Sequence, residues 1–186
     1  MKKAALLILL TLPLTLGGCG TTTPLTTVTT TTSGNWEAQL TGGTGQASKL
    51  NFVTTFTVTN INGQSAQPLT ITGFSFFNTQ PCFVSGETES GNATLNTNTA
   101  NQVTGSMNYT VTSGVPPGNM LTLTADPTKG GGVSGTANGT PGTTGKLSNG
   151  VATGTWTLTG GGGDSSCGNQ SGTFIMCQGS NTCTPP

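Results

Sequence analysis

The fold is decided by the stretch Val103-Thr104-Gly105-Ser106-Met107-Asn108-Tyr109-Thr110-Val111-Thr112. Every odd position in it holds an apolar residue or glycine, and every even position holds Thr, Ser or Asn. Successive side chains of a strand point to opposite faces of the sheet. This period of two therefore predicts an antiparallel strand with one face in a core.

The same alternation recurs along the chain, and helical periodicity does not. It is clear over residues 36–40, 50–58 and 152–159, where most of the intervening positions are polar. Weaker strands are expected over residues 69–77, 82–88, 93–95, 120–125, 132–137 and 173–178. The apolar phase slips near Gly73, where a bulge would restore the register. Turn residues such as Asp126-Pro127 separate the strands.

Short strands at this spacing predict an all-β fold of one domain. We expect an antiparallel up-and-down β-barrel of about eight to ten strands, with a β-sandwich as the alternative. The barrel is favoured because closure removes exposed strand edges, and this chain has few charges to protect such edges. Its five basic and five acidic residues are spread over 186 positions.

Two short motifs resemble a known barrel family. Gly34-Asn35-Trp36, at the start of the first expected strand, resembles the G-x-W motif of the lipocalins, and Gly154-Thr155-Trp156 repeats the pattern. The resemblance implies an eight-stranded calycin barrel whose interior can hold a small apolar ligand. The arginine that packs over this tryptophan in lipocalins has no counterpart here, because the chain contains no arginine.

The N-terminus has the order of an export signal. Lys2-Lys3 precedes an apolar run over residues 4–16, which is too short to span a bilayer as a helix. The motif that follows, Leu16-Gly17-Gly18-Cys19, resembles the lipobox of bacterial lipoproteins. The resemblance implies cleavage before Cys19 and acylation of its thiol and amine, which together give durable anchoring.

This resemblance also implies a location and a division of the chain. The residue after the cysteine is Gly20 and not the Asp associated with inner-membrane retention, so we expect the outer membrane of the bacterial envelope. The expected parts are a signal peptide over residues 1–18, a lipidated cysteine with a Thr-rich flexible tether over 19–34, a β domain over 35–178, and a tail over 179–186 tied by a disulfide.

Apart from Cys19, the cysteines are Cys82, Cys167, Cys177 and Cys183. An even number in an exported chain indicates two disulfides, for which three pairings exist. We favour Cys82 with Cys167, which joins a mid-chain strand to the loop before the last strand. The other two would then close a short tail.

The composition excludes several classes of function. Beyond the expected signal peptide, three lysines stand against five carboxylates, a formal side-chain charge of −2. Without arginine or a basic cluster, the chain lacks the electrostatic footprint of nucleic-acid binding. It also has no histidine, which removes Ser-His-Asp and Cys-His catalysis and most metal sites. We expect no cofactor and no metal.

Glu87 and Glu89 are the remaining candidates for chemistry. They stand two residues apart, so on a strand they share one face. Such a pair could serve as the carboxylates of a glycosidase or bind a cation. The alternative is a solvated strand end beside the Gly86 turn.

We therefore expect a non-catalytic envelope lipoprotein whose β domain has a structural or binding role, with the membrane as its partner through acyl chains on Cys19. An envelope protein is a further candidate partner. An alternative is a lipocalin-like carrier of a small apolar ligand, and a more remote one is a hydrolase that uses the two glutamates. The carrier's pocket would be lined by aromatic residues, which are equally expected to fill a solid core: Trp36, Phe52, Phe56, Phe74, Phe76, Tyr109 and Trp156.

The substitution Cys19→Ser tests the anchor. It removes the thiol that must be acylated before cleavage, so the precursor should remain uncleaved and unlipidated. Intact mass spectrometry of the wild-type and variant proteins reads this out. A wild-type N-terminus at another residue, without acyl mass, would refute the localisation.

Overall fold

The computed structural model describes residues 30–31, 34–58, 65–83, 86–114, 118–138, 145–160, 167–179 and 183. The expected signal peptide and the lipobox with Cys19 lie outside these residues. Among the described residues, no helix has the length and apolar character needed to cross a membrane.

The structure confirms the all-β prediction. Its strands are β1 Thr30–Thr31, β2 Asn35–Thr41, β3 Phe52–Thr57, β4 Gln67–Pro68, β5 Thr70–Phe76, β6 Glu87–Thr97, β7 Gln102–Ser113, β8 Met120–Ala125, β9 Gly132–Asn138, β10 Gly145–Thr159 and β11 Gln170–Gln178. Three short 3-10 turns complete it: η1 Gly45–Lys49, η2 Pro81–Phe83 and η3 Pro127–Lys129. The clear alternations of the sequence correspond to β2, β3, β7 and β10.

One predicted strand is wrong. Residues 82–88 do not form a single strand, because η2 takes up Pro81–Phe83 and β6 begins only at Glu87. Pro81 cannot donate a ladder hydrogen bond, and Cys82 is held by a disulfide away from any strand partner. The short strand predicted over 93–95 is part of the much longer β6.

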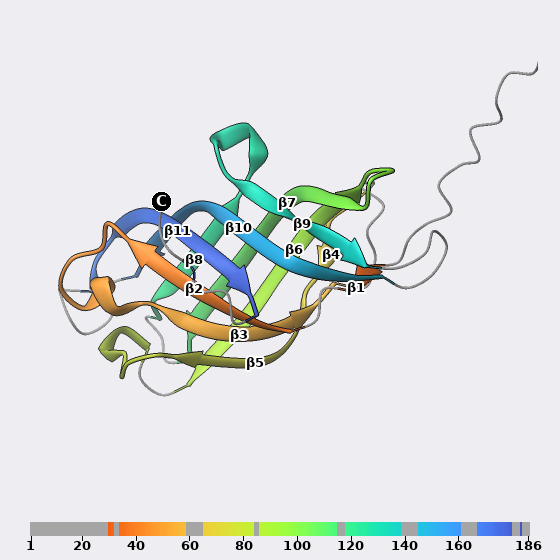
Figure 1. The fold of residues 1–186 in the computed structure, drawn as a ribbon. Coiled ribbons are helices and arrows are strands. Elements are labelled where there is room, and N and C mark those ends of the chain that lie inside the picture. Colours follow the sequence, from red (N-terminus) through yellow and green to blue (C-terminus); the bar gives the residue numbers. More distant parts are fainter. Residues whose placement is uncertain are drawn as a thin grey trace, which may run out of the picture.

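The hydrogen-bonded strands form one continuous sheet. Its path runs β4-β6-β7-β8-β10-β11-β2-β3-β5, and the two end strands are separated in the chain by Leu69 alone. The Leu69 N–H donates to Gly91 O of β6 at 2.9 Å. Strand β9 also pairs with β7 and β10. It therefore lies between these two strands, as β8 does over another part of their length. Figure 1 shows the strands arranged around a common interior.

Apart from the short parallel pairing of β1 with β10, the described strands pair antiparallel. Half of the neighbours on this path are also consecutive along the chain: β6 and β7, β7 and β8, β10 and β11, and β2 and β3. The bulge predicted near Gly73 is confirmed. Thr55 of β3 pairs with Gly73, but the next residue, Phe56, pairs with Ile71, so Thr72 is the extra residue.

A single core fills the space inside the sheet. Its centre includes Tyr109, which is fully buried and whose hydroxyl lies 2.7 Å from the Thr54 hydroxyl. Thr54 Oγ1 in turn donates to Gly73 O at 3.0 Å. This chain of hydrogen bonds satisfies the two buried hydroxyls, which would otherwise destabilise the core.

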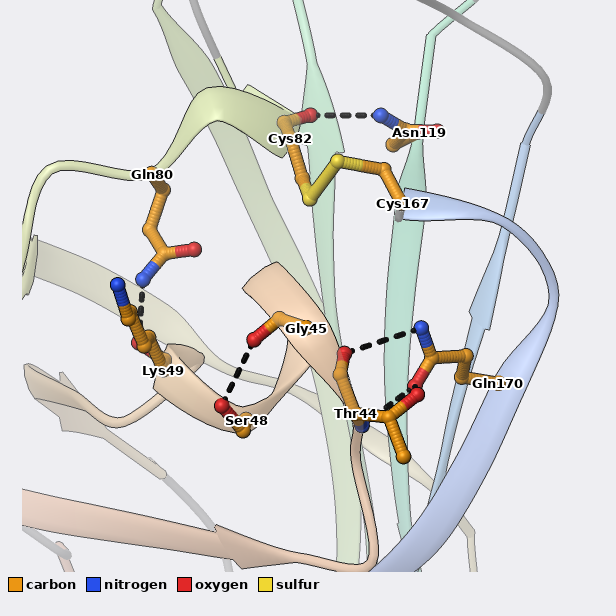
Figure 2. Close-up of a disulfide and its surroundings, with 9 residues drawn as sticks. All are labelled: Thr44, Gly45, Ser48, Lys49, Gln80, Cys82, Asn119, Cys167 and Gln170. Atoms are coloured by element: carbon orange, nitrogen blue, oxygen red, sulfur yellow. Dashed lines mark hydrogen bonds between the residues drawn. A yellow bond between two sulfur atoms is a disulfide. The ribbon is translucent and has the colours of Figure 1, made fainter. Parts of the chain in front are cut away.

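The structure contains two disulfides, in the pairing favoured from the sequence. Cys82 is bonded to Cys167 across 85 positions of the chain, and Cys177 is bonded to Cys183 across 6 positions. Figure 2 shows the first of these beside Asn119, whose Nδ2 donates to Cys82 O at 2.8 Å. The first disulfide therefore connects η2, just before β6, to the segment that leads into β11.

Side chains close the same end of the sheet around η1. The Thr44 N–H donates to Gln170 Oε1 at 2.8 Å, and Gln170 Nε2 donates back to Thr44 O at 3.3 Å. Gln80 Nε2 donates to Lys49 O, at the end of η1. These contacts, drawn in Figure 2, hold η1 against the segments that carry the first disulfide.

The two disulfides should differ in what they contribute to stability. In the chain-entropy model, losing the bridge across the long loop costs about 4 to 5 kcal/mol, and losing the short one costs about 2 kcal/mol. We expect Cys82→Ala with Cys167→Ala to lower the unfolding free energy by about twice as much as Cys177→Ala with Cys183→Ala. Urea unfolding of both double variants measures this, and equal losses would contradict the loop-length explanation.

Candidate functional site

The predicted aromatic residues form a packed cluster. Trp36, Phe52, Phe56, Tyr109 and Trp156 are each at most 1% exposed. The rings of Trp36 and Phe56 are stacked with their centroids 5.2 Å apart, and those of Phe52 and Tyr109 are stacked at 5.5 Å. These contacts are the offset and stacked arrangements that stabilise aromatic cores.

The two other aromatics, Phe74 and Phe76, are partly buried and pack against this cluster. They contact each other edge to face with centroids 4.9 Å apart, and Phe74 also stacks on Tyr109 at 6.5 Å. Both lie on β5, an end strand of the pairing path, which leaves them more accessible than the rings deeper inside.

The structure does not support the ligand-carrier interpretation of these residues. The void that borders Trp36 and Phe56 has a volume of about 10 Å³. That is room for about one water molecule, whereas pockets for small ligands usually measure about 300 to 1,000 Å³. In the described part of the chain, these rings therefore act as core and not as pocket lining.

The two tryptophans have different polar environments. Trp156 Nε1 donates to Thr41 O at 2.8 Å. Trp36 Nε1 is buried and has no hydrogen-bond partner among the described residues.

Glu87 and Glu89 share a face of β6, as the sequence predicts, and that face is the inner one. Glu89 pairs with Val111 of β7, a residue that is 0% exposed, and Glu87 pairs with Ser113. Directly paired residues of an antiparallel ladder point to the same face. Both glutamates are partly buried.

This position changes the acidity of two groups. Burial raises the pKa of Glu89 above its ordinary value of 4.5, a backbone hydrogen bond at Glu89 lowers it in part, and the Glu87 charge raises it further. Burial also raises the pKa of Tyr109, against the lowering effect of its hydrogen bond with Thr54, and the Glu89 charge adds to the rise. Glu89 therefore keeps its proton to a higher pH than a free glutamate does.

The structure does not gather further chemical groups around this pair. Within the described residues, no three His, Cys, Asp or Glu side chains come together in a way that could hold a metal ion. The arrangement places the Glu89 carboxyl on the inner face near the aromatic cluster, and its partial burial raises its pKa.

A second feature, which the sequence did not reveal, is a groove on the outer face of the sheet. It has a volume of about 330 Å³, and its floor is formed by β2, β10 and β11. Its lining from these strands is mostly polar, with Gln39, Thr41, Thr153, Thr155 and Thr173 beside Ile175, and Lys129 and Gly130 also line it.

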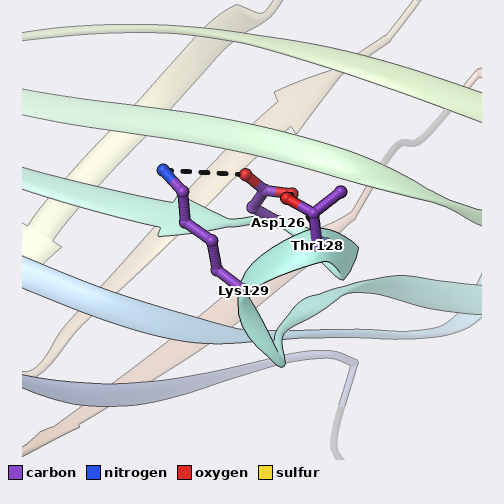
Figure 3. Close-up of polar contacts among 3 residues, drawn as sticks. All are labelled: Asp126, Thr128 and Lys129. Carbon is purple, nitrogen blue, oxygen red and sulfur yellow. Dashed lines mark hydrogen bonds and ion pairs between the residues drawn. The ribbon is translucent and has the colours of Figure 1, made fainter.

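The wall of the groove is the short excursion between β8 and β9, built on Asp126. The Asp126 carboxylate accepts hydrogen bonds from the Thr128 N–H at 2.9 Å and from the Thr128 hydroxyl at 2.8 Å. Its backbone carbonyl accepts from the N–H groups of Lys129 and Gly131, both at 3.0 Å. Lys129 Nζ lies 3.7 Å from Asp126 Oδ2, as Figure 3 shows.

Electrostatics agree with this geometry. The hydrogen bonds from Thr128, chiefly that from its side chain, hold the pKa of Asp126 below its ordinary value, and the Lys129 charge adds to this. The sequence predicted the turn at Asp126-Pro127, and the structure confirms it as the N-cap of η3. The sequence carried no signal that this turn overhangs the face of three other strands.

Comparison with models of known protein families, with curated proteins and with solved structures finds no match to this chain.

The raised pKa of Glu89 predicts a pH dependence of stability. Because the folded state binds this proton more tightly than the unfolded state, the contribution of Glu89 is most favourable below 4.5. It is lost as the pH rises through the raised pKa. Glu89→Gln should therefore be more stable than the wild type at neutral pH, with the difference vanishing in acid.

Urea unfolding between about pH 3 and pH 8 measures this difference. Glu37→Gln is the matched control, since Glu37 lies on the outer face of β2 between the buried Trp36 and Ala38. It makes the same exchange of Glu for Gln at a carboxyl outside the core. A Glu89→Gln difference that is constant across this range would show that burial does not perturb the carboxyl.

Proposed function

We propose that this chain is a lipid-anchored lipoprotein of the bacterial envelope, whose disulfide-bonded β domain serves in structure or binding and not in catalysis. The observation that carries the proposal is the use of the cysteines. The sequence has five, and four of them form two disulfides inside the β domain. This leaves Cys19, the residue at the lipobox position, as the thiol available for lipid.

The disulfides support an oxidising location. Structural disulfides persist in exported proteins and are rare in the reducing cytosol. All four half-cystines are at most 6% exposed, so both bridges are protected from exchange with external thiols. Export and attachment to a membrane would explain both the oxidised cysteine pairs and the lipobox.

The first described strand supports a tethered arrangement. Thr30 and Thr31 pair in parallel with Gly145 and Lys146, at the start of β10. From Cys19 to this attachment point, a fully extended chain reaches at most about 40 Å. The Thr-rich segment would therefore hold the domain close to the membrane surface, with the β1 side nearest to it.

The chemistry of the chain supports a non-catalytic role. It contains no histidine, and the one carboxylate pair that the sequence singled out faces the inside of the sheet beside packed aromatic rings. A glycosidase would need both carboxyls to flank a substrate in an open cleft.

Counting free thiols tests the proposal. Full-length protein extracted from membranes in detergent is denatured without reductant and alkylated, and the experiment is repeated after reduction. We expect no alkylation before reduction and four alkylated thiols after it, because the Cys19 sulfur is a thioether. The Cys82→Ala, Cys167→Ala double variant is the control and should show two after reduction.

Either of two results would contradict the proposal. Five alkylated thiols after reduction would show that Cys19 carries no lipid. Four before reduction would show that the β domain is not oxidised in the cell.

A further inference from the structure

The outer face of the sheet carries a row of threonines that leads into the groove beside Lys129. Thr41 of β2 pairs with Thr173 of β11, Thr173 pairs with Thr155 of β10, and Thr155 pairs with Thr124 of β8. We call these four residues the threonine row. Three of them, Thr41, Thr155 and Thr173, also line the groove.

The threonine row is regular and accessible. Thr41, Thr155 and Thr173 are exposed, and Thr124 is half-buried. Because the row crosses the strands at right angles, its residues follow one another at about the strand spacing of 4.8 Å. A second row of the same kind, formed by Ser171, Thr157 and Thr122, runs beside it.

The chemistry of this face is that of hydroxyl groups with few charges. A threonine hydroxyl both donates and accepts, and the Thr41 and Thr173 hydroxyls lie 2.8 Å apart, each with further hydrogen-bonding capacity. The threonine methyl groups and Ile175 add apolar surface between the hydroxyls. Lys129, on the opposite wall, is already paired with Asp126.

We propose that this face binds an extended, uncharged polysaccharide, which lies along the threonine row and enters the groove below Lys129. Each sugar unit presents hydroxyls that donate and accept, together with apolar C–H faces, and so matches the threonines in both respects. In an extended glycan the units repeat over a distance close to the strand spacing, which allows one unit per strand. The groove volume of about 330 Å³ falls in the range of small-ligand sites.

The excursion between β8 and β9, which forms the wall of the groove, is held in place by close contacts. Gly131 lies against β10 so closely that a Cβ there would be 2.4 Å from Thr153 O. The hydrogen bonds to Asp126 described above fix the rest of the excursion. A polar surface held in place before binding loses less conformational entropy when a ligand binds.

Co-sedimentation with insoluble chitin and with cellulose tests the proposal, using the full-length protein in detergent. The variant Thr155→Val, Thr173→Val removes two hydroxyls of the row and keeps the β-branched shape. The control is Thr70→Val, an exposed threonine on β5 outside the groove. Lys129→Gln removes the charge from the groove wall and keeps a hydrogen-bond donor.

We expect the wild type to sediment with at least one of the two polysaccharides. The double variant should bind at least about tenfold more weakly, as the loss of two hydrogen bonds implies. Thr70→Val should bind like the wild type, and Lys129→Gln should stay within about threefold of it. Thermal unfolding of each variant checks that the fold is retained.

Three results would overturn the proposal: no sedimentation with either polysaccharide, wild-type binding by the double variant, or a loss of tenfold or more in Lys129→Gln alone. The last would mean that the ligand is recognised by charge. The inference does not depend on the anchor. A chain with a free Cys19 that still binds would refute the lipoprotein proposal and leave the polysaccharide site standing.

Discussion

One antiparallel sheet packs a single hydrophobic core against one of its faces, and this constraint determines the rest of the structure. Leu69 joins β4 and β5, which are the two end strands of the pairing path. The strands from β6 to β3 lie between these ends, and the described strands share one inner face. Side chains on that face have no water to contact unless they lie near an edge. The period of two in the sequence follows directly, with apolar residues inside and Thr, Ser or Asn outside.

Packing so many rings inside a small sheet requires small partners opposite large ones. Trp156 pairs with Gly172 of β11, where a Cβ would lie 2.7 Å from Trp156 Nε1 and 1.8 Å from Thr41 O. Only glycine leaves room for the indole to donate to Thr41 O. Tyr109 likewise pairs with Gly91 of β6. These pairs explain why glycines interrupt the apolar positions of long strands.

The sequence predicted those features that depend on local pattern. Strands with clear alternation, the bulge at Gly73 and the turn at Asp126-Pro127 depend on neighbouring residues, and each is found where expected. The wrong strand over residues 82–88 has a non-local cause, since the disulfide to Cys167 holds Cys82 in η2. The outer groove could not be predicted, because it depends on how distant strands are placed.

The two glutamates of β6 are charged residues on the inner face, and the topology explains why the fold tolerates them. Strand β4 pairs with β6 only at Asn92 and Ala93, and Leu69 adds one bond to Gly91. Among the described strands, residues 87–90 of β6 therefore pair with β7 alone. Water can reach a side chain at such an edge, which keeps Glu87 and Glu89 only partly buried and limits the desolvation that raises the Glu89 pKa. Farther along β6, at Ala93 and Leu95, the same face is buried, and there an unpaired carboxylate would destabilise the fold.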